Sequence, residues 1–431
     1  MKHAKLDNNL RPLGIFERAL ALYDRKSPFN VVSVLRLENA PSPETVQRAL
    51  DVLQNRHPLL KAGIENNKFI KLLNPIIQFQ VSKSQNDADW LEIVEQELNK
   101  RLDPPNGLLR GNYIQHLSST TSELILTIHH AIMDAVSGMT LLDELLQLCT
   151  KSDLTKESQA EILPPVEDRF PPAFKDLRGS IQTAKYVMAQ MVEGLSFQWH
   201  ALGKRKPVFN KNSRGFPMIL TLPEALVDDL SKQCRARKVT LNSLLNAVIV
   251  LAASRLLYAG DSRPMQTFSF ADLRPYTIPP TPPDQLANYI SMLRYTVSVS
   301  GQMDIWSLAI DLHAKIYKSL KSGSKFTASK VSESLIRMFI GLEKIRMGNT
   351  ALNYCGAVSI KPIYGDIKVL DVRGFLSTAH IGPEVAAQAR LFNNELQIDF
   401  MFLKTDMDRD MAEKIVEEVK AVLEQAAMRT V

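Results

Sequence analysis

The stretch that decides the fold is Leu124-Ile125-Leu126-Thr127-Ile128-His129-His130-Ala131-Ile132-Met133-Asp134. We expect its apolar beginning, Leu124–Ile128, to form a buried strand, and residues Ser137–Leu148 to form the helix that follows. His129 and His130 then lie at a strand-to-helix turn. Adjacent side chains leaving a strand point to opposite faces, so the two rings are expected to have different surroundings. One ring can face a substrate while the other is packed.

The residues alone leave two interpretations of this His pair open. A His is suited to general-base catalysis because its ordinary pKa lies near neutral pH. A His at the end of an apolar strand also commonly serves as a hydrogen-bonded structural residue. A metal site is disfavoured, because neighbouring histidines diverge on a strand and no Cys or further His lies at chelating spacing. We therefore expect no metal.

The segment resembles the His-His-x-x-x-Asp-Gly signature of the condensation-domain and CoA-dependent acyltransferase superfamily, and the following residues 137–142 are similar as well. The resemblance is to the stand-alone polyketide-associated or alcohol acyltransferases in particular. One position departs from the signature, since Ala135 stands where the family usually has Gly. Only Gly adopts positive φ freely or lets another chain approach without a Cβ. If the turn needs either property, Ala135 narrows the site.

Further segments resemble the same superfamily, and they follow its order over nearly the whole chain. They are Ser27–Leu37 with the helix Thr45–Gln54 and Arg56–Leu60, then Pro104–Arg110, Val239–Leu245, Asp272–Pro275 and Leu352–Gly356. Each is weak alone. Their order makes the resemblance stronger than any one motif does.

Size and composition bound the class of protein. A chain of 431 residues with 45% hydrophobic content exceeds the size at which one core usually divides, so two domains are expected. Cys149, Cys234 and Cys355 are scattered, which favours a reducing compartment over a disulfide framework. The formal charge of +6 comes without a dense basic tract, so nucleic acid is not expected as the main partner.

The sequence shows no targeting or membrane-spanning segment. Residues 1–9 are polar and lack the apolar core of a signal peptide. The longest apolar run, Leu244–Ala253, is shorter than the roughly 20 residues that cross a bilayer. We therefore expect a cytoplasmic protein that contacts a membrane at most peripherally.

Alternating strands and helices predict an α/β protein with mixed sheets. Late in the chain we expect strands near 352–360, 366–372, 375–381 and 395–402. The resemblance implies two chloramphenicol-acetyltransferase-like domains with an active-site channel between them. We expect an N-terminal acyltransferase half carrying the His-His motif over residues 1–165, a connecting helix and linker over 166–215, and a C-terminal acyltransferase half over 216–431.

The connecting helix is expected over Phe174–Leu202, where apolar residues recur at helical spacing. Packing against its own domain is the favoured interpretation. A membrane-surface role stays open, because Phe197, Trp199 and the basic residues 204–206 supply the groups that such helices use.

By resemblance, His130 is the general base that takes a proton from the acceptor and passes it to the departing thiolate. His129, Asp134 and Arg274 are expected to be structural at the active site, with Arg274 as the partner of Asp134. Asn353 is a candidate contact to the oxyanion or the substrate. A turn residue beside a glycine is the competing interpretation of Asn353.

The resemblance implies an acyltransferase of lipid or secondary metabolism that moves an acyl group to a small-molecule alcohol or amine. The donor is expected to be an acyl-CoA or an acyl-carrier phosphopantetheine thioester, used as a co-substrate, with no bound cofactor and with an acyl carrier protein as a candidate partner. Two basic clusters, at Lys204–Arg214 and Lys318–Lys325, either steer such an anionic donor or form solvated surface. Two alternatives stay open: amide-forming condensation between carrier-bound substrates, and a non-catalytic binding protein that retains the fold, for which Ala135 is the main support.

Overall fold

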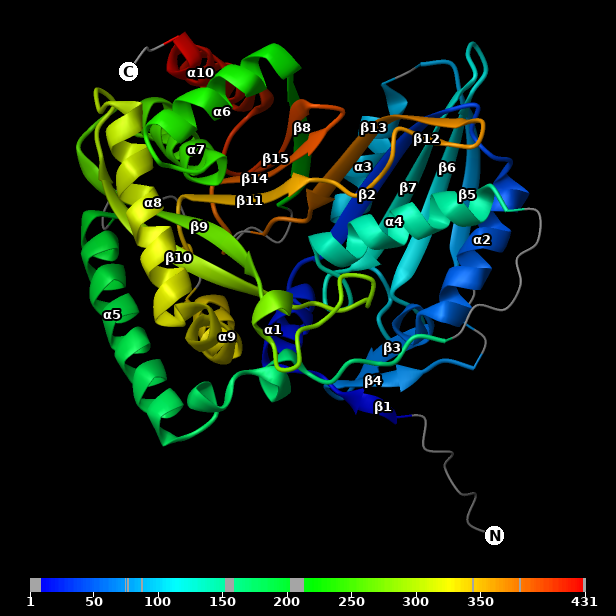
Figure 1. The fold of residues 1–431 in the computed structure, drawn as a ribbon, viewed down its shortest axis with the longest axis horizontal. Coiled ribbons are helices and arrows are strands. Elements are labelled where there is room, and N and C mark those ends of the chain that lie inside the picture. Colours follow the sequence, from blue (N-terminus) through cyan, green and yellow to red (C-terminus); the bar gives the residue numbers. More distant parts are fainter. Residues whose placement is uncertain are drawn as a thin grey trace. The chain divides into compact units, whose positions relative to one another are not determined.

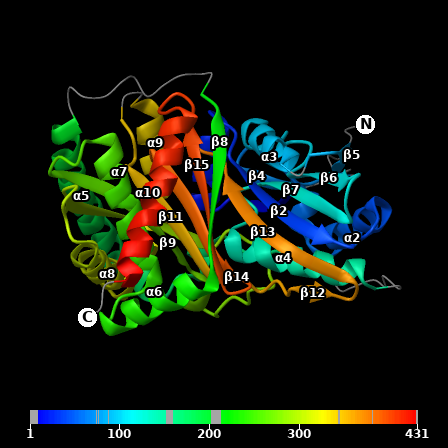
Figure 2. The same ribbon diagram turned by 90° about the horizontal axis from the view of Figure 1, so that it is seen from above.

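The computed structural model describes residues 9–73, 75, 77–86, 88–151, 159–201, 213–342, 345–379 and 381–428. The chain forms two compact units, each assembled from three segments (Figures 1 and 2). The first unit comprises Met1–Arg169, Arg274–Tyr289 and Ser359–Gly374, and the second comprises Phe170–Leu273, Ile290–Val358 and Phe375–Val431. The sequence predicts continuous halves, whereas the units are interleaved along the chain.

The first unit is built on a mixed six-stranded sheet in the order β12-β13-β2-β7-β6-β5. Its strands are β2 (Asn30–Glu38), β5 (Gln78–Ser84), β6 (Leu109–His116), β7 (Thr121–His129), β12 (Ile363–Tyr364) and β13 (Ile367–Leu376). β7 pairs antiparallel with β2 and β6, while β5 and β6 run parallel. Leu124–Ile128 are fully buried within β7, so the strand predicted there is confirmed.

Helices cover both faces of this sheet. They are α1 (Ile15–Asp24), α2 (Pro43–Arg56), α3 (Asp89–Asn99) and α4 (Ala135–Cys149), with 3-10 turns at Pro58–Lys61, Val166–Arg169 and Arg274–Tyr276. Figures 1 and 2 show α3 on one face and α4 on the other. A small sheet in the order β1-β4-β3 joins β1 (Asn9–Pro12), β3 (Ala62–Glu65) and β4 (Lys68–Lys71). The predicted helices at 45–54 and 137–148 are confirmed as parts of α2 and α4.

The second unit has a mixed sheet in the order β10-β9-β11-β14-β15-β8. Its strands are β8 (Gly215–Leu222), β9 (Arg263–Asp272), β10 (Ile290–Val299), β11 (Thr350–Ala357), β14 (Val385–Phe392) and β15 (Glu395–Leu403). The strand predicted over 375–381 is wrong, because β13 ends at Leu376 and the described residues between it and Val385 form no strand. The strand between β11 and β15 is instead β14, which the sequence analysis did not predict.

The helices of the second unit are α5 (Leu177–Ala201), α6 (Glu224–Ala236), α7 (Leu241–Leu257), α8 (Ile305–Ser322), α9 (Ser324–Gly341) and α10 (Arg409–Met428), with a 3-10 turn at Pro172–Phe174. α7 is buried from Ser243 to Ser254, as expected for a helix that is apolar on all sides. Among the described residues, no single helix has the length and apolar composition to cross a membrane, and α6 with α7 meets that test only as a pair bent by 103°.

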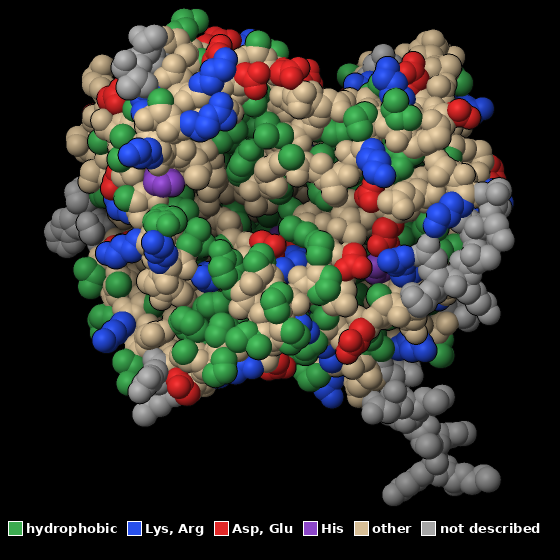
Figure 3. All heavy atoms as spheres, viewed as in Figure 1, with side chains coloured by type: hydrophobic (Ala, Val, Ile, Leu, Met, Phe, Trp, Pro, Cys, Tyr) green, Lys and Arg blue, Asp and Glu red, His purple; other side chains and the backbone are tan. Residues whose placement is uncertain are grey.

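Lys and Arg side chains lie at the surface along α8 (Figure 3). Lys318 and Lys321 of the predicted basic cluster are exposed there. Lys325 is only 4% exposed, and its Nζ donates to the carbonyl of Leu320 at 2.6 Å. The cluster at 318–325 therefore presents fewer exposed cations than the sequence suggests. Of the other predicted cluster, residues 204–211 lie outside the described residues.

Candidate active site

The two histidines lie where β7 ends and α4 begins, as the strand-turn-helix pattern predicts. Asp134 is the N-cap of α4, and its Oδ1 accepts a hydrogen bond from the Ser137 amide at 3.0 Å. Within the turn, the Ile132 amide donates to the His129 carbonyl at 3.1 Å. Residues 131–133 are completely buried. The turn is thus held by its own hydrogen bonds and by packing.

The His129 ring is packed inside the first unit, where it is 1% exposed. Its Nδ1 accepts from the Ala131 amide at 3.1 Å, so the ring proton lies on Nε2. Nε2 lies 3.7 Å from Oδ2 of Asp24, which also accepts from Nε of Arg101 at 2.8 Å. Burial acts to raise the pKa of Asp24, but the neighbouring His129 and Arg101 hold it below its usual value. His129 therefore stabilises the buried carboxylate of Asp24.

The His130 ring has a different environment, at 8% exposure. Its Nδ1 lies 2.8 Å from the carbonyl of Met133, which accepts only, so Nδ1 carries the proton and Nε2 keeps its lone pair. The ring of Phe29 packs beside it at a centroid distance of 5.4 Å. Burial lowers the pKa of His130, against the opposing effects of the Met133 carbonyl and the Asp134 charge. The ring is thus a neutral base at pH 7.

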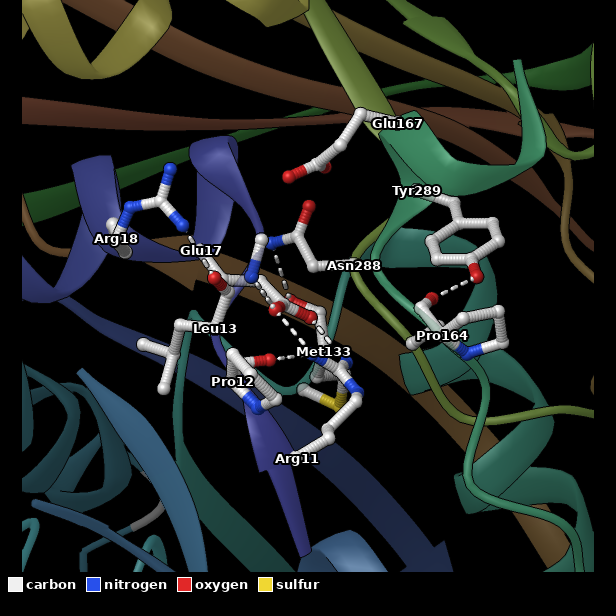
Figure 4. Close-up of polar contacts among 12 residues, drawn as sticks. Arg11, Pro12, Leu13, Glu17, Arg18, Met133, Pro164, Glu167, Asn288 and Tyr289 are labelled. Atoms are coloured by element: carbon white, nitrogen blue, oxygen red, sulfur yellow. Dashed lines mark hydrogen bonds and ion pairs between the residues drawn. The ribbon is translucent and has the colours of Figure 1, made fainter.

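Asn288 holds the turn from a distant part of the sequence. Its Nδ2 donates to the His130 carbonyl at 2.6 Å and lies 3.5 Å from the Met133 carbonyl, beside which Figure 4 shows it. The same nitrogen lies 3.4 Å from Nδ1 of His130. Because both nitrogens carry protons in the tautomer given above, this contact is not a hydrogen bond. Asn288 is 1% exposed, and no described residue supplies a hydrogen bond to its Oδ1. Asn288 follows the segment that resembles the family's arginine-bearing stretch, but it was not predicted as a site residue, because 158 residues separate it from His130 and spacing along the chain does not show that the two meet.

Asp134 and Arg274 form the buried pair that the resemblance implies. Oδ2 of Asp134 accepts from Nη1 of Arg274 at 2.7 Å and from the Tyr289 amide at 2.8 Å. Nη2 of Arg274 donates to Oγ of Ser137 at 2.8 Å and to the carbonyl of Ala287 at 3.1 Å. The two side chains are 0% and 2% exposed. The pair therefore joins the start of α4 to the 274–289 segment.

A layer of polar contacts extends this anchoring of the 274–289 segment (Figure 4). The hydroxyl of Tyr289 contacts the carbonyl of Pro164, and Glu167 accepts from the Ile15 amide through Oε1 at 2.7 Å. Glu17 pairs with Arg11 and accepts from the Gly14 amide at 2.6 Å, which caps α1. The segments around residues 14, 165 and 289 are thereby tied within the first unit.

Asn353 belongs to β11 of the second unit. It is half-buried, and its Nδ2 donates to Sγ of Cys355 at 3.6 Å. Gly356 follows with φ of +70°, a left-handed conformation that favours glycine. The proposed contact of Asn353 with an oxyanion or a substrate stays a prediction. For metals, the described part of the chain holds no group of three His, Cys, Asp or Glu residues suited to binding an ion.

Comparisons with known proteins cover nearly the whole chain. Residues 19–262 match the family model described as Condensation domain, and residues 217–400 match the model of the phthiocerol/phthiodiolone dimycocerosyl transferase C-terminus. A phthiocerol/phthiodiolone dimycocerosyl transferase of Mycobacterium leprae (strain TN) is 22% identical over 389 residues, which are 85% of each chain.

Solved structures agree on the fold. The structure of polyketide synthase associated protein 5 from Mycobacterium tuberculosis matches with a TM-score of 0.72 at 18% identity, over 98% of this chain and 99% of that one. Trichothecene 15-O-acetyltransferase from Fusarium sporotrichioides matches with a TM-score of 0.74 at 13% identity, over 97% and 95%. The mixed α/β architecture predicted from the sequence is thus confirmed.

Proposed function

Because the chain belongs to the condensation domain family and is an acyltransferase, we propose that it moves an acyl group from a thioester to a hydroxyl, with His130 as general base. The observation that carries this proposal is the hydrogen bond between Nδ1 of His130 and the Met133 carbonyl. That bond fixes the tautomer whose Nε2 accepts a proton. The lowered pKa of His130 supports the same role, because the ring then stays neutral at pH 7.

The reaction needs one proton carrier and no covalent enzyme intermediate. Nε2 of His130 takes the hydroxyl proton while the acceptor oxygen bonds to the thioester carbonyl carbon. The tetrahedral intermediate then collapses, the carbon–sulfur bond breaks, and His130 returns the proton to the departing thiolate. While the imidazolium exists, the Met133 carbonyl and the charge of Asp134 stabilise it, since both act to raise the pKa of His130.

Asp134 and Arg274 act in this proposal as positioning residues. Both of the Asp134 oxygens are occupied by donors from Ser137, Arg274 and Tyr289, so this carboxylate holds the turn rather than a substrate. The tetrahedral oxyanion also needs donors. Asn353 is our nominee for that contact, and its assignment rests on the sequence resemblance.

CoA and a carrier protein both present the thioester on a phosphopantetheine arm, and we propose either as donor. A hydroxyl acceptor is favoured over an amine, in line with the O-acetyltransferase among the similar structures. Amide formation between carrier-bound substrates is the alternative within the same family.

The test is release of free thiol from acyl-CoA and from acyl-loaded carrier protein, measured with a panel of alcohols and of amines. The expected result is acceptor-dependent thiol release with an equal amount of ester, lost in His130→Ala. His313→Ala is the matched control, because that ring is half-buried in the second unit and contacts Ser243 at 3.3 Å. Thiol release no faster than the blank with every donor and acceptor would indicate a binding protein. Equal activity of His130→Ala and wild type would remove His130 as the base.

A further inference from the structure

Two buried oxygen atoms of the first unit accept no hydrogen bond from any described residue. One is Oδ1 of Asn288, which is 1% exposed, and the other is Oε2 of Glu167. Figure 4 shows the side-chain oxygen of Asn288 pointing toward the Glu167 carboxyl group. Leaving a buried acceptor without a donor is unfavourable, and here two acceptors face each other. The pair therefore needs a donor between its members.

The two side chains belong to segments that are joined on either side of them. On one side, the hydroxyl of Tyr289 contacts the carbonyl of Pro164. On the other side, Nη2 of Arg169 donates to the carbonyl of Pro279 at 2.8 Å. These contacts lie within the first unit, so they keep the carboxyl and the amide facing each other.

The surroundings of the Glu167 carboxyl favour its protonated form. Its Oε1 accepts from the Ile15 amide at 2.7 Å, which leaves Oε2 for a proton. Burial raises the pKa of Glu167, the charges of Glu17 and Asp168 add to that effect, and the nearby amides oppose it. Arg11 is committed to Glu17, whose two oxygens it contacts at 2.6 Å each. The charged and titratable side chains around this carboxyl are Arg11, Glu17, Arg18, Asp168, Arg169 and Tyr289.

The proton on Glu167 decides which way the Asn288 amide lies. With Nδ2 toward the histidine turn, the amide donates to the His130 carbonyl at 2.6 Å, and Oδ1 needs a donor on the opposite side. A protonated carboxyl supplies that donor. An ionised carboxyl only accepts, so it attracts Nδ2 and turns Oδ1 against the carbonyls of His130 and Met133. The amide then loses its contact with the turn.

We propose that Glu167 carries a proton and donates it in a hydrogen bond to Oδ1 of Asn288, which makes Glu167 a positioning residue for the histidine turn. The effect on catalysis rests on the proposed function, because His130 is the base there. No proton moves between Glu167 and the substrate. When Glu167 ionises, the turn loses the anchor that Asn288 provides, so activity falls as the pH rises.

The first measurement is kcat for thiol release from acyl-CoA as a function of pH. Wild type should show an alkaline limb with its midpoint above pH 4.5, the ordinary pKa of Glu. Glu167→Gln should remove this limb and keep a maximal kcat close to that of wild type, because Nε2 donates at every pH while Oε1 still accepts from the Ile15 amide. Glu167→Ala should lower kcat by about three- to tenfold at every pH, the effect of one lost hydrogen bond. Asn288→Ala should also lack the limb, because no amide is left to turn.

The second measurement needs no catalysis. It follows the side-chain amide signals of isotope-labelled asparagine by NMR, and the Asn288 signal is identified by its loss in Asn288→Ala. This signal should move with pH in wild type, with a midpoint above pH 4.5, and stay constant in Glu167→Gln. The matched control is Glu161→Gln, which makes the same change on an exposed side chain of the same stretch. It should behave like wild type in both measurements.

Three outcomes overturn the proposal. They are an alkaline limb that survives in Glu167→Gln, a loss of kcat in Glu167→Gln as large as in Glu167→Ala, and an Asn288 signal that does not respond to pH in wild type or responds equally in Glu167→Gln. Circular dichroism checks that each variant is folded. If no donor and acceptor give thiol release, the proposed function fails instead, and the NMR titration then decides the contact between Glu167 and Asn288 by itself.

Discussion

Removing either member of the Asp134–Arg274 pair should destabilise the first unit by unequal amounts. Asp134→Ala deletes the α4 N-cap, worth about 1 kcal/mol. It also leaves a guanidinium that is 2% exposed without its anion, which costs about 3 to 5 kcal/mol. We therefore expect a loss of about 4 to 6 kcal/mol in unfolding free energy. Arg274→Ala should lie at the lower end, about 3 kcal/mol, because Asp134 keeps the amides of Ser137 and Tyr289 as donors.

The double variant separates a shared interaction from two local effects. With both charges gone, no uncompensated ion stays buried, so the combined loss should fall about 2 to 3 kcal/mol short of the sum of the single losses. If Asp134→Ala does not fold, Asp134→Asn serves in the same cycle, because the amide oxygen still caps α4 while the charge is removed.

The assay is urea unfolding followed by tryptophan fluorescence. Trp90 is 3% exposed in α3 of the first unit, whereas Trp199 and Trp306 belong to the second. A background of Trp199→Phe and Trp306→Phe makes Trp90 the reporter of the unit that contains the pair. Shifts in midpoint at constant slope report stability. Single losses that add to within about 0.5 kcal/mol would refute the coupling and withdraw Arg274 from the site.

Three further predictions concern the histidine turn. His130→Ala should lower kcat by about 10² to 10⁴ with an unchanged melting temperature, because it removes a general base. His129→Ala should instead cost about 1 to 3 kcal/mol of stability, because it leaves the Ala131 amide unpaired, and the folded fraction should lose little kcat. Equal activity losses at unchanged melting temperatures would mean that the two rings are wrongly assigned. Since burial lowers the pKa of His130 below the ordinary 6.5, kcat/KM should fall toward acid pH as the ring gains a proton, with the midpoint of that limb below pH 6.5. A limb centred above pH 6.5 would contradict the neutral base. Asn288→Asp should move the acid limb of kcat/KM to higher pH, because a carboxylate then lies within 3.4 Å of the ring Nδ1–H. Asn288→Ala should lower kcat without moving the limb. An unmoved limb in Asn288→Asp would mean that residue 288 only packs against the turn.

Local patterns predicted the elements that carry the histidines, and resemblance predicted the long-range pair. The run Leu124–Ile128 identifies β7 because its branched apolar residues suit a buried strand. The helix was predicted from Ser137, whereas α4 begins at Ala135 with Asp134 as its N-cap. β14 escaped notice because Val385–Phe392 contains three alanines and two polar residues, a composition with weak strand propensity. Its pairing with β11 and β15 overrides that local preference.

Contacts between distant segments lay beyond the sequence patterns. β13 neighbours β2 in the sheet of the first unit, although more than 300 residues separate the two strands. Asn288 reaches the histidine turn in a similar way, because residues 274–289 belong to the first unit although the segments on either side of them belong to the second. The spacing of residues along the chain does not show which distant segments pack together. The Asp134–Arg274 pair was found only because a known family resembles this chain at both positions.

Ala135, the one departure from the family signature, shows how the backbone decides what a substitution means. Asp134 is the N-cap, so Ala135 is the first residue of α4, and it is not among the described residues with positive φ. A glycine at this position would gain no conformation that alanine lacks, and it would disfavour the helix by up to about 1 kcal/mol. The alanine is half-buried, and the turn before it is held by the Asp134 cap and by Asn288, neither of which uses the side chain at 135. The departure therefore leaves the turn that carries the His130 ring intact, and a need for positive φ at residue 135 no longer supports the non-catalytic alternative.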